Sequence, residues 1–223
     1  MRLSVVLFLI AISAVLAGSV TIKSLVFPTE TSTSYVGMTP KKPMTLNAFT
    51  LCMRVATELP GERETILFAY RTSYYDELNV WRELDGSLSF ALAGGTVKFQ
   101  VPPFSALQSH LCITWDSSSG ASTVFMDGRK SLTKTYKQGH TIQPNGKVII
   151  GQDPDNYLGE FDAKQSFVGE MCDINMWDSV LSDSTINDLF TGKRVPRGNV
   201  LDWETAEFEV QGQAQVVDRE LYL

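Results

Sequence analysis

Short runs of alternating apolar and polar residues recur along the chain. Every second position is apolar in residues 49–55, and the same pattern occupies residues 111–115. Strict alternation places apolar side chains on one face of a strand and polar side chains on the other. Several such runs with turn signals between them are typical of antiparallel sandwiches. The pattern therefore predicts an all-β fold.

Four turn dipeptides lie between these runs. They are Asp85-Gly86, Gly94-Gly95, Asp127-Gly128 and Asn145-Gly146. Residue pairs of this kind tolerate the positive φ angles that a two-residue hairpin requires. We expect a β-hairpin turn at each of the four sites.

One segment has helical spacing instead. Within residues 181–192, three apolar residues follow the i, i+3, i+4 pattern of an amphipathic helix. Ser182 is suited to cap the first turn, and Gly192 is suited to end the last. The chain should therefore carry one short helix packed on one sheet.

The first residues have the layout of a secretory signal. A positive charge precedes an apolar run over residues 3–16, and the small residues Ala17 and Gly18 follow. This run is too short for a membrane span, and no second apolar stretch of spanning length occurs. We expect residues 1–17 to be a signal peptide, cleaved after Ala17 or Gly18, and residues 18–223 to be one secreted domain.

The composition is that of an acidic domain with a core. Hydrophobic residues make up 43% of the 223 residues, and the formal net charge is −6. A net acidic surface disfavours nucleic acids and anionic membranes as partners by bulk attraction. An anionic ligand would therefore need a local positive centre, such as a bound metal ion.

Three cysteines are present, so two can pair in an oxidising compartment and one is left over. Cys52 and Cys112 occupy the more polar positions of their runs, which is compatible with a bridge between two strands. Cys172 instead shares its parity with Ile174 and Met176. We expect a Cys52–Cys112 disulfide and a buried free thiol at Cys172.

Carboxylates concentrate in residues 151–165, which read GQDPDNYLGEFDAKQ. Four acidic residues stand against a single lysine, and their mutual repulsion makes such a loop costly to fold unless a cation lies in it. Ca²⁺ suits this loop because it takes about 6–8 oxygen ligands in a flexible geometry. An EF-hand does not fit, because Leu158 stands where that motif requires glycine. Two interpretations remain at this point, a solvated acidic loop and part of a calcium site.

The residues from His110 to Ser117 read HLCITWDS. They match the pentraxin signature, His-x-Cys-x-Ser/Thr-Trp-x-Ser/Thr, at every fixed position. Further segments resemble the same family, and the similarity covers essentially the whole chain after the signal: Phe27-Pro28, residues 33–36, residues 124–128, residues 175–178 and residues 209–212. The chain is therefore identified as resembling the pentraxin family.

This resemblance implies a flattened two-sheet antiparallel jelly roll with one helix on one face. It also implies a homopentamer or related ring, and two Ca²⁺ ions on one face of each subunit. A ligand phosphate or other anion would complete the coordination of these ions. The helix, on the opposite face, would recruit complement and receptors.

Carried over residue by residue, the resemblance implies a set of calcium ligands from two segments. Asp153 and Asp162 stand where many relatives have Glu, and Glu77 stands where they have Asn. Each change keeps an oxygen donor, so calcium binding should survive. The full set is Asp76, Glu77, Asp153, the main-chain carbonyl of Pro154, Asp155, Asp162 and Gln165.

The pocket for phosphocholine matches less well. Alignment without gaps back from the signature places Thr96 at the family's pocket glutamate and Ala91 at a pocket threonine. The pocket phenylalanine falls near Val80 and Trp81. Trp81 has two interpretations, a core aromatic or a cation–π partner contributing about 0.5–2 kcal/mol. Because the carboxylate is missing, a preference for phosphocholine is doubtful, whereas capture of anionic groups is not.

Asp127 matches a family position implicated in binding complement C1q. An Asp-Gly hairpin turn explains the same residue without a partner, and both interpretations stay open.

The leading hypothesis is a secreted, calcium-dependent pattern-recognition protein of innate immunity. Its partners would be further copies of itself, complement C1q, Fc receptors, and phosphocholine, phosphoethanolamine or other anionic or saccharide ligands. A calcium-dependent carbohydrate lectin without phosphocholine specificity is the alternative. An enzyme is disfavoured, because only two histidines occur and the acidic cluster is better explained as metal ligands.

Overall fold

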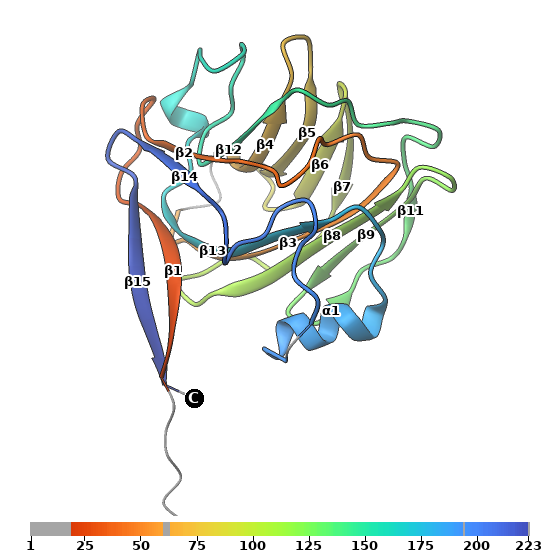
Figure 1. Cartoon of the computed structure of the whole chain (residues 1–223). Coiled ribbons are helices and arrows are strands. Elements are labelled where there is room, and N and C mark those ends of the chain that lie inside the picture. The colour runs from red at the N-terminus through yellow and green to blue at the C-terminus, as the bar shows by residue number, and fades with distance from the viewer. Residues whose placement is uncertain (1–18, 60–62, 194, 223) are drawn as a thin grey trace, which may run out of the picture.

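Two antiparallel sheets face each other as a sandwich (Figure 1). The computed structural model describes residues 19–59, 63–193 and 195–222, and the predicted signal peptide lies outside them. Every strand pair among the described residues is antiparallel. The predicted all-β sandwich is confirmed.

The first sheet has the strand order β10-β9-β8-β3-β13-β1-β15, with β11 also paired to β9. Its strands are β1 Ser19–Phe27, β3 Ala48–Ala56, β8 Ser109–Asp116, β9 Ala121–Met126, β10 Arg129–Lys130, β11 Lys134–Thr135, β13 Gly169–Trp177 and β15 Gln215–Tyr222.

The second sheet has the strand order β14-β2-β12-β4-β5-β6-β7. Its strands are β2 Tyr35–Met38, β4 Thr65–Arg71, β5 Asp76–Arg82, β6 Leu88–Leu92, β7 Gly95–Phe99, β12 Lys147–Ile150 and β14 Phe208–Gln211.

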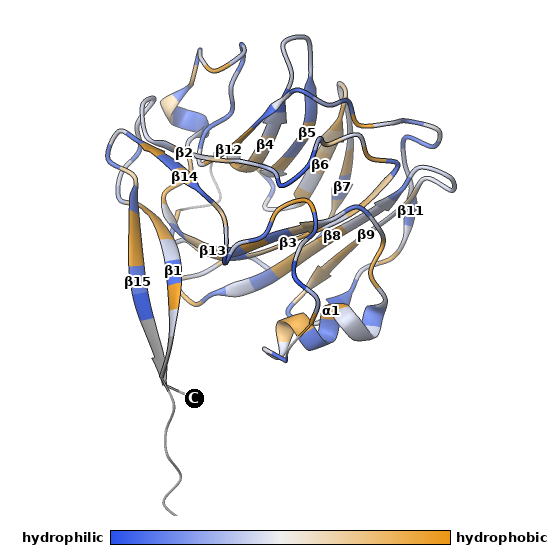
Figure 2. Cartoon of the chain, in the orientation of Figure 1, coloured by the Kyte–Doolittle hydropathy of each residue, from blue (hydrophilic) through white to orange (hydrophobic). Residues whose placement is uncertain are grey.

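The hydrophobic core fills the space between the two sheets. Phe49 of β3 meets Phe90 of β6 across the sandwich with ring centroids 6.1 Å apart, and it packs on Trp115 of β8 at 5.9 Å. All three residues are fully buried. Figure 2 shows that apolar residues lie mainly along the strands. The alternation in the sequence therefore corresponds to core-facing positions, as predicted.

The helix α1, Asp183–Phe190, packs on the outer face of the first sheet (Figure 1). Ser182 caps it by accepting a hydrogen bond from the Thr185 amide at 3.1 Å, as expected. Ile186 is its buried residue and joins a small cluster with both bridged cysteines. Within the described ranges, no helix has the length and apolar character needed to cross a membrane.

The predicted disulfide is present beneath this helix. Cys52 of β3 and Cys112 of β8 stand directly opposite each other in register and are bonded. The side chains at the more polar positions of these two strands thus point to the face that α1 covers. Those at the alternate, apolar positions point to the core. Cys172 is a buried free thiol, as predicted.

Three of the four predicted hairpin turns form. Gly86 lies in the turn between β5 and β6, Asp127-Gly128 connects β9 to β10 with positive φ at both residues, and the β6–β7 turn lies at Ala93-Gly94. Asn145-Gly146 is different, because β12 pairs with β2 and β4 and not with a strand just before it. A Cβ atom at Gly146 would lie 2.6 Å from the Tyr70 ring, so a close contact explains this glycine.

We expect the disulfide to stabilise the fold substantially. It joins cysteines 60 residues apart, for which chain entropy predicts a contribution of up to about 4 kcal/mol to the free energy of unfolding. Denaturant unfolding should show this loss in the Cys52→Ala/Cys112→Ala variant. A reductant should destabilise the native chain and a Cys172→Ala control, but not the double variant. Equal sensitivity of all three proteins would contradict the prediction.

Candidate functional site

The acidic loop, residues 151–165, is closed at its base. The Phe167 amide donates to the Gly151 carbonyl at 3.0 Å, which brings the two ends of the loop together. The buried side chain of Gln152 donates to the Ser34 carbonyl at 3.2 Å and also to the Thr31 carbonyl. These contacts tie the start of the loop to the segment before β2.

The far end of the loop is also anchored. Phe161 packs against Tyr35 on the outer face of the second sheet, with ring centroids 5.1 Å apart. Asp162 then begins the short 3₁₀ helix η1, Ala163–Gln165, by accepting a hydrogen bond from the Lys164 amide at 2.9 Å. Arg63 donates to the Ala163 carbonyl at 3.2 Å. The loop, at the upper left of Figure 1, is therefore held at both ends.

Three carboxylates from two distant segments meet at this loop. Asp153 is only 6% exposed. Its burial and the repulsion from Asp76 and Asp155 raise the pKa of its carboxyl to about 7. The structure thus brings Asp76, at the start of β5, to the two aspartates of the acidic loop.

Asn79 of β5 belongs to the same cluster and was not predicted. Its Nδ2 donates to Asp153 Oδ1 at 2.8 Å, and its side chain is buried. Asn79 alternates with Leu78 and Val80, which face the core, so its side chain points to the outer face of the second sheet. The sequence signal that could have identified it is a polar residue at an outward-facing strand position, three residues after Asp76.

Two amide oxygens, one at the cluster and one at the end of η1, lack hydrogen-bond donors. Within the described part of the chain, Asn79 Oδ1 and Gln165 Oε1 are buried without a partner. Leaving such an acceptor unpaired costs about 1–3 kcal/mol. One cation is close to the carboxylates, because Arg71 Nη1 lies 2.5 Å from Asp76 Oδ1 and lowers the pKa of Asp153.

A divalent cation that prefers oxygen ligands fits this donor set. The carboxylates repel one another, and a positive ion among them would remove that cost. The unpaired amide oxygens are hard neutral donors of the type that Ca²⁺ takes together with carboxylates. The residues present therefore match calcium chemistry.

Glu77 is placed differently from the prediction. It is 2% exposed, accepts a hydrogen bond from the Gln143 amide at 3.0 Å and lies 3.6 Å from His140 Nε2. The reason is a register shift in the β4–β5 pair. Arg71 stands opposite Asp76 and Tyr70 opposite Leu78, so Glu77 has no partner on β4. Its carboxylate holds the segment around residue 143, and a role in binding calcium remains a prediction.

The other predicted ligands of the loop differ in their surroundings. Pro154 is buried and Asp155 is exposed next to Asp153. Asp162 uses Oδ1 to cap η1, and its side chain is exposed.

The predicted ligand pocket is partly assembled. Asn79, Ala91 and Thr96 stand opposite one another on β5, β6 and β7 and so share the outer face of the second sheet. Trp81 lies two residues further along β5, half-buried on the same face. Val80 is fully buried in the core, so it cannot line an external pocket. The reason is its parity, which is opposite to that of its neighbour Trp81.

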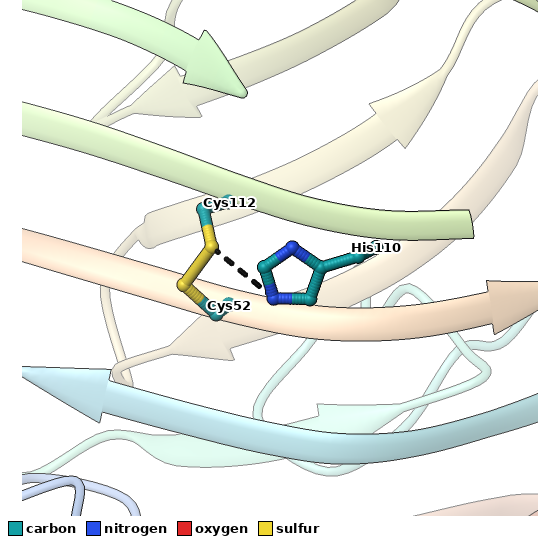
Figure 3. A group of neighbouring side chains, drawn as sticks. All are labelled: Cys52, His110 and Cys112. Atoms are coloured by element: carbon teal, nitrogen blue, oxygen red, sulfur yellow. Dashed lines mark hydrogen bonds between the residues drawn. A yellow bond between two sulfur atoms is a disulfide. The ribbon is translucent and has the colours of Figure 1, made fainter. Parts of the chain in front are cut away.

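A second group of potential metal ligands is structural. Cys52, His110 and Cys112 place their ligand atoms within 4.8 Å of one another (Figure 3). The two sulfurs are bonded to each other, and a metal would require free thiolates. Burial and the nearby Arg54 lower the pKa of His110 to about 4, which keeps its ring neutral at physiological pH. This group supports α1 and is not a metal site.

Asp127 connects the β9–β10 turn to strand β8. Its Oδ1 accepts a hydrogen bond from the His110 amide at 2.8 Å, and its own amide donates to the His110 carbonyl at 2.9 Å. These bonds give the residue a structural role that needs no partner protein. A contact with complement remains a prediction.

The comparisons with known proteins agree with this fold. The model described as the Pentaxin family matches residues 23–218. The chain is 51% identical to a C-reactive protein of Danio rerio over 198 residues, covering 87% of this chain and 88% of that protein. It is 38% identical to the C-reactive protein of Homo sapiens over 194 residues, covering 86% and 85%. A heptameric SAP-like pentraxin from Limulus polyphemus has a TM-score of 0.76 at 22% identity, covering 87% and 94%, which supports the fold.

The raised pKa of Asp153 predicts a pH-dependent stability in chelator. A carboxyl with a pKa raised in the folded state contributes stability that is present below pH 4 and lost as the pH rises through about 7. The change from 3.8 to about 7 corresponds to a loss of roughly 4 kcal/mol at most. Asp153→Asn should remove this dependence.

Unfolding free energies of both proteins across this range, in chelator, check the prediction. Asp218→Asn, at an exposed position of β15, is the matched control and should keep the native pH profile. Parallel profiles for native protein and Asp153→Asn would contradict the assignment.

Proposed function

The chain belongs to the pentraxin family, and from this premise we propose that it is a secreted, calcium-dependent recognition protein of innate immunity. It captures phosphate-bearing or other anionic groups on microbial or damaged-cell surfaces. The observation that carries the proposal is the cluster of Asp76, Asp153 and Asp155 with the unpaired amide oxygen of Asn79 beside it. We propose a binding protein and not an enzyme.

The calcium, two ions per subunit, would be held by Asp76, Asp153, Asp155, Asp162, Gln165 and the Pro154 carbonyl. Bound calcium supplies positive charge that oxygen atoms of an anionic ligand can reach. Asp153 is the buried anchor, fixed by its hydrogen bond with a strand residue. Asp155 is exposed at the rim, where a ligand arrives from solvent. In a net acidic protein, these carboxylates thus create a local cationic centre.

The neighbouring outer face disfavours a choline cation. Asn79, Ala91 and Thr96, which stand opposite one another on this face, include no carboxylate that could face a quaternary nitrogen. Lys98, the next outward residue of β7, brings a positive charge that is 54% exposed and paired with Glu83. We therefore propose that this protein takes phosphate or other anionic groups without the choline selectivity of the family pocket. A calcium-dependent lectin that binds saccharide hydroxyls through the same ions is the alternative.

Ring assembly would convert weak capture at each subunit into firm attachment. The family implies a homopentamer or a related ring, and the similar Limulus pentraxin is heptameric. Once one site of a ring has bound a surface, the remaining sites meet the other ligands of that surface at a high effective concentration, without any new kind of contact. A repetitive surface would then be retained, whereas a monomeric ligand would exchange.

The opposite face suits a second class of partner. The cluster lies on the outer side of the second sheet, and α1 covers the outer side of the first sheet (Figure 1). We propose that complement C1q and Fc receptors engage this helix face, which includes Asp127 beside α1. Ligand and effector could then be bound at the same time.

Calcium-dependent retention tests the proposed function. The native chain should bind a phosphoethanolamine resin in calcium and elute with chelator or with inorganic phosphate. Asp76→Asn/Asp153→Asn should bind at least about 10-fold more weakly, since even outer-shell changes cost metal sites that much. Asp188→Asn, on the helix face, should bind like the native chain. Elution by free sugar and not by phosphate would favour the lectin, and retention unchanged by chelator would refute calcium dependence.

The missing carboxylate predicts a gain of selectivity. Thr96→Glu should raise the potency of phosphocholine relative to inorganic phosphate by a few-fold, since an exposed ion pair contributes about 0.2–1 kcal/mol. Competition on the same resin measures the ratio of the two potencies. Thr96→Gln, which has the same size without the charge, should leave that ratio unchanged. An equal effect of both variants would contradict a role for charge at this position.

A further inference from the structure

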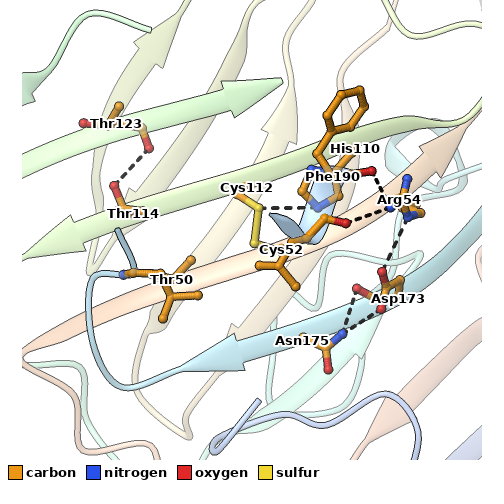
Figure 4. Close-up of a disulfide and its surroundings, with 12 residues drawn as sticks. Thr50, Cys52, Arg54, His110, Cys112, Thr114, Thr123, Asp173, Asn175 and Phe190 are labelled. Atoms are coloured by element: carbon orange, nitrogen blue, oxygen red, sulfur yellow. Dashed lines mark hydrogen bonds and ion pairs between the residues drawn. A yellow bond between two sulfur atoms is a disulfide. The ribbon is translucent and has the colours of Figure 1, made fainter. Parts of the chain in front are cut away.

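Two asparagine–aspartate pairs occupy the two sheets of the sandwich. Asn79 Nδ2 donates to Asp153 Oδ1 on the second sheet, and Asn175 Nδ2 donates to Asp173 Oδ1 on the first. Both donor–acceptor distances are 2.8 Å. Figure 4 shows the second pair, next to Arg54. The pairs are alike in chemistry and differ in what happens to the amide oxygen.

The oxygen of Asn175 is satisfied. It accepts a hydrogen bond from the Trp203 amide at 3.0 Å, so both ends of this side chain serve the fold. Asn79 Oδ1 is buried and has no donor among the described residues. With Asn79 itself 4% exposed, solvent offers little compensation. Of the two amides, the buried one at the carboxylate cluster therefore lacks an internal partner, whereas the half-buried one on β13 has partners at both ends.

The orientation of the Asn79 amide follows from its neighbour. The ionised form of Asp153, which is the form that binds a cation, only accepts hydrogen bonds, so the NH₂ end of Asn79 faces it and the oxygen is left over. The sheet does not require a polar residue here, because the facing residue on β6 is Ala91. An unpaired buried acceptor in a native protein calls for a partner from outside the chain. A cation bound by Asp153 is the partner whose chemistry matches.

We infer that Asn79 is a further calcium ligand, contributing Oδ1 from strand β5 to the site that the acidic loop builds. Together with Asp76 it makes β5 a rigid side of the site, against which the loop residues close. This inference rests on the proposed calcium site. It assigns a role to a residue that neither the acidic loop nor the family motif includes.

A narrower role for Asn79 would be to position Asp153 through its N–H alone. Two substitutions separate the roles. Asn79→Asp keeps an oxygen at this position and removes the N–H, whereas Asn79→Leu removes both. A ligand role predicts that Asn79→Asp retains or increases calcium affinity while Asn79→Leu loses about 10-fold or more. A positioning role predicts that both variants lose affinity.

The test is a calcium titration of the full chain by calorimetry, repeated with Tb³⁺ luminescence. Asn175→Leu is the matched control and should keep native calcium affinity, because it removes the same hydrogen bond on the other sheet. Native affinity in Asn79→Leu, or an equal loss in Asn79→Asp and Asn79→Leu, would overturn the inference.

Thermal unfolding, measured in chelator and again with calcium, provides a readout that is independent of the titration. Asn79→Leu removes the unpaired acceptor and also the hydrogen bond to Asp153, two changes of opposite sign, so its melting temperature in chelator should stay close to that of the native chain. Its gain on adding calcium should be smaller than the native gain. Asn175→Leu should melt lower under both conditions. A native chain that gains nothing from calcium would refute the proposed function itself, whereas an equal calcium gain in native chain and Asn79→Leu would refute only this inference.

Discussion

The burial of the Asp153 carboxylate beside two other carboxylates is the constraint on which the rest of the structure depends. Charged groups leave water at a high cost unless they find partners, and like charges add to that cost. The fold meets it in part with an amide donor and an arginine in the neighbourhood. The proposed calcium ion would remove the remaining electrostatic cost. The carboxylate cluster therefore lowers the stability of the chain in the absence of a cation.

The sandwich makes this arrangement rigid. The acidic loop is tied at its base to residues before β2 and at its far end to the outer face of the second sheet. The first sheet carries the disulfide and α1, so its outer face is closed by packing. The two outer faces of the sandwich thus differ in chemistry. The carboxylate cluster lies at the outer face of the second sheet, and a helix covers the outer face of the first. This separation fits a protein that binds a surface on one side and a partner on the other.

Much of this could be predicted from local patterns, and the failures have physical causes. Alternation, turn dipeptides and helix periodicity are local signals, so the sandwich, α1 and the Cys52–Cys112 bridge followed from them. Asn145-Gly146 was wrong as a hairpin, because a contact with Tyr70 demands that glycine. Asn79 was missed because its importance comes from Asp153, 74 residues away. No local pattern carries such a distant contact.

Glu77 shows how one backbone irregularity divides two adjacent carboxylates between different tasks. In a regular strand, successive side chains point to opposite faces, so Asp76, Glu77 and the residues after them would alternate without interruption. The register shift leaves Glu77 unpaired on β4, so it turns to the Gln143 amide while Asp76 faces the cluster. Glu77 then holds the neighbouring segment, and Asp76 stays beside Asp153. A family motif therefore predicts which residue types are present, but the irregularity in the β4–β5 pair determines which partners each side chain contacts.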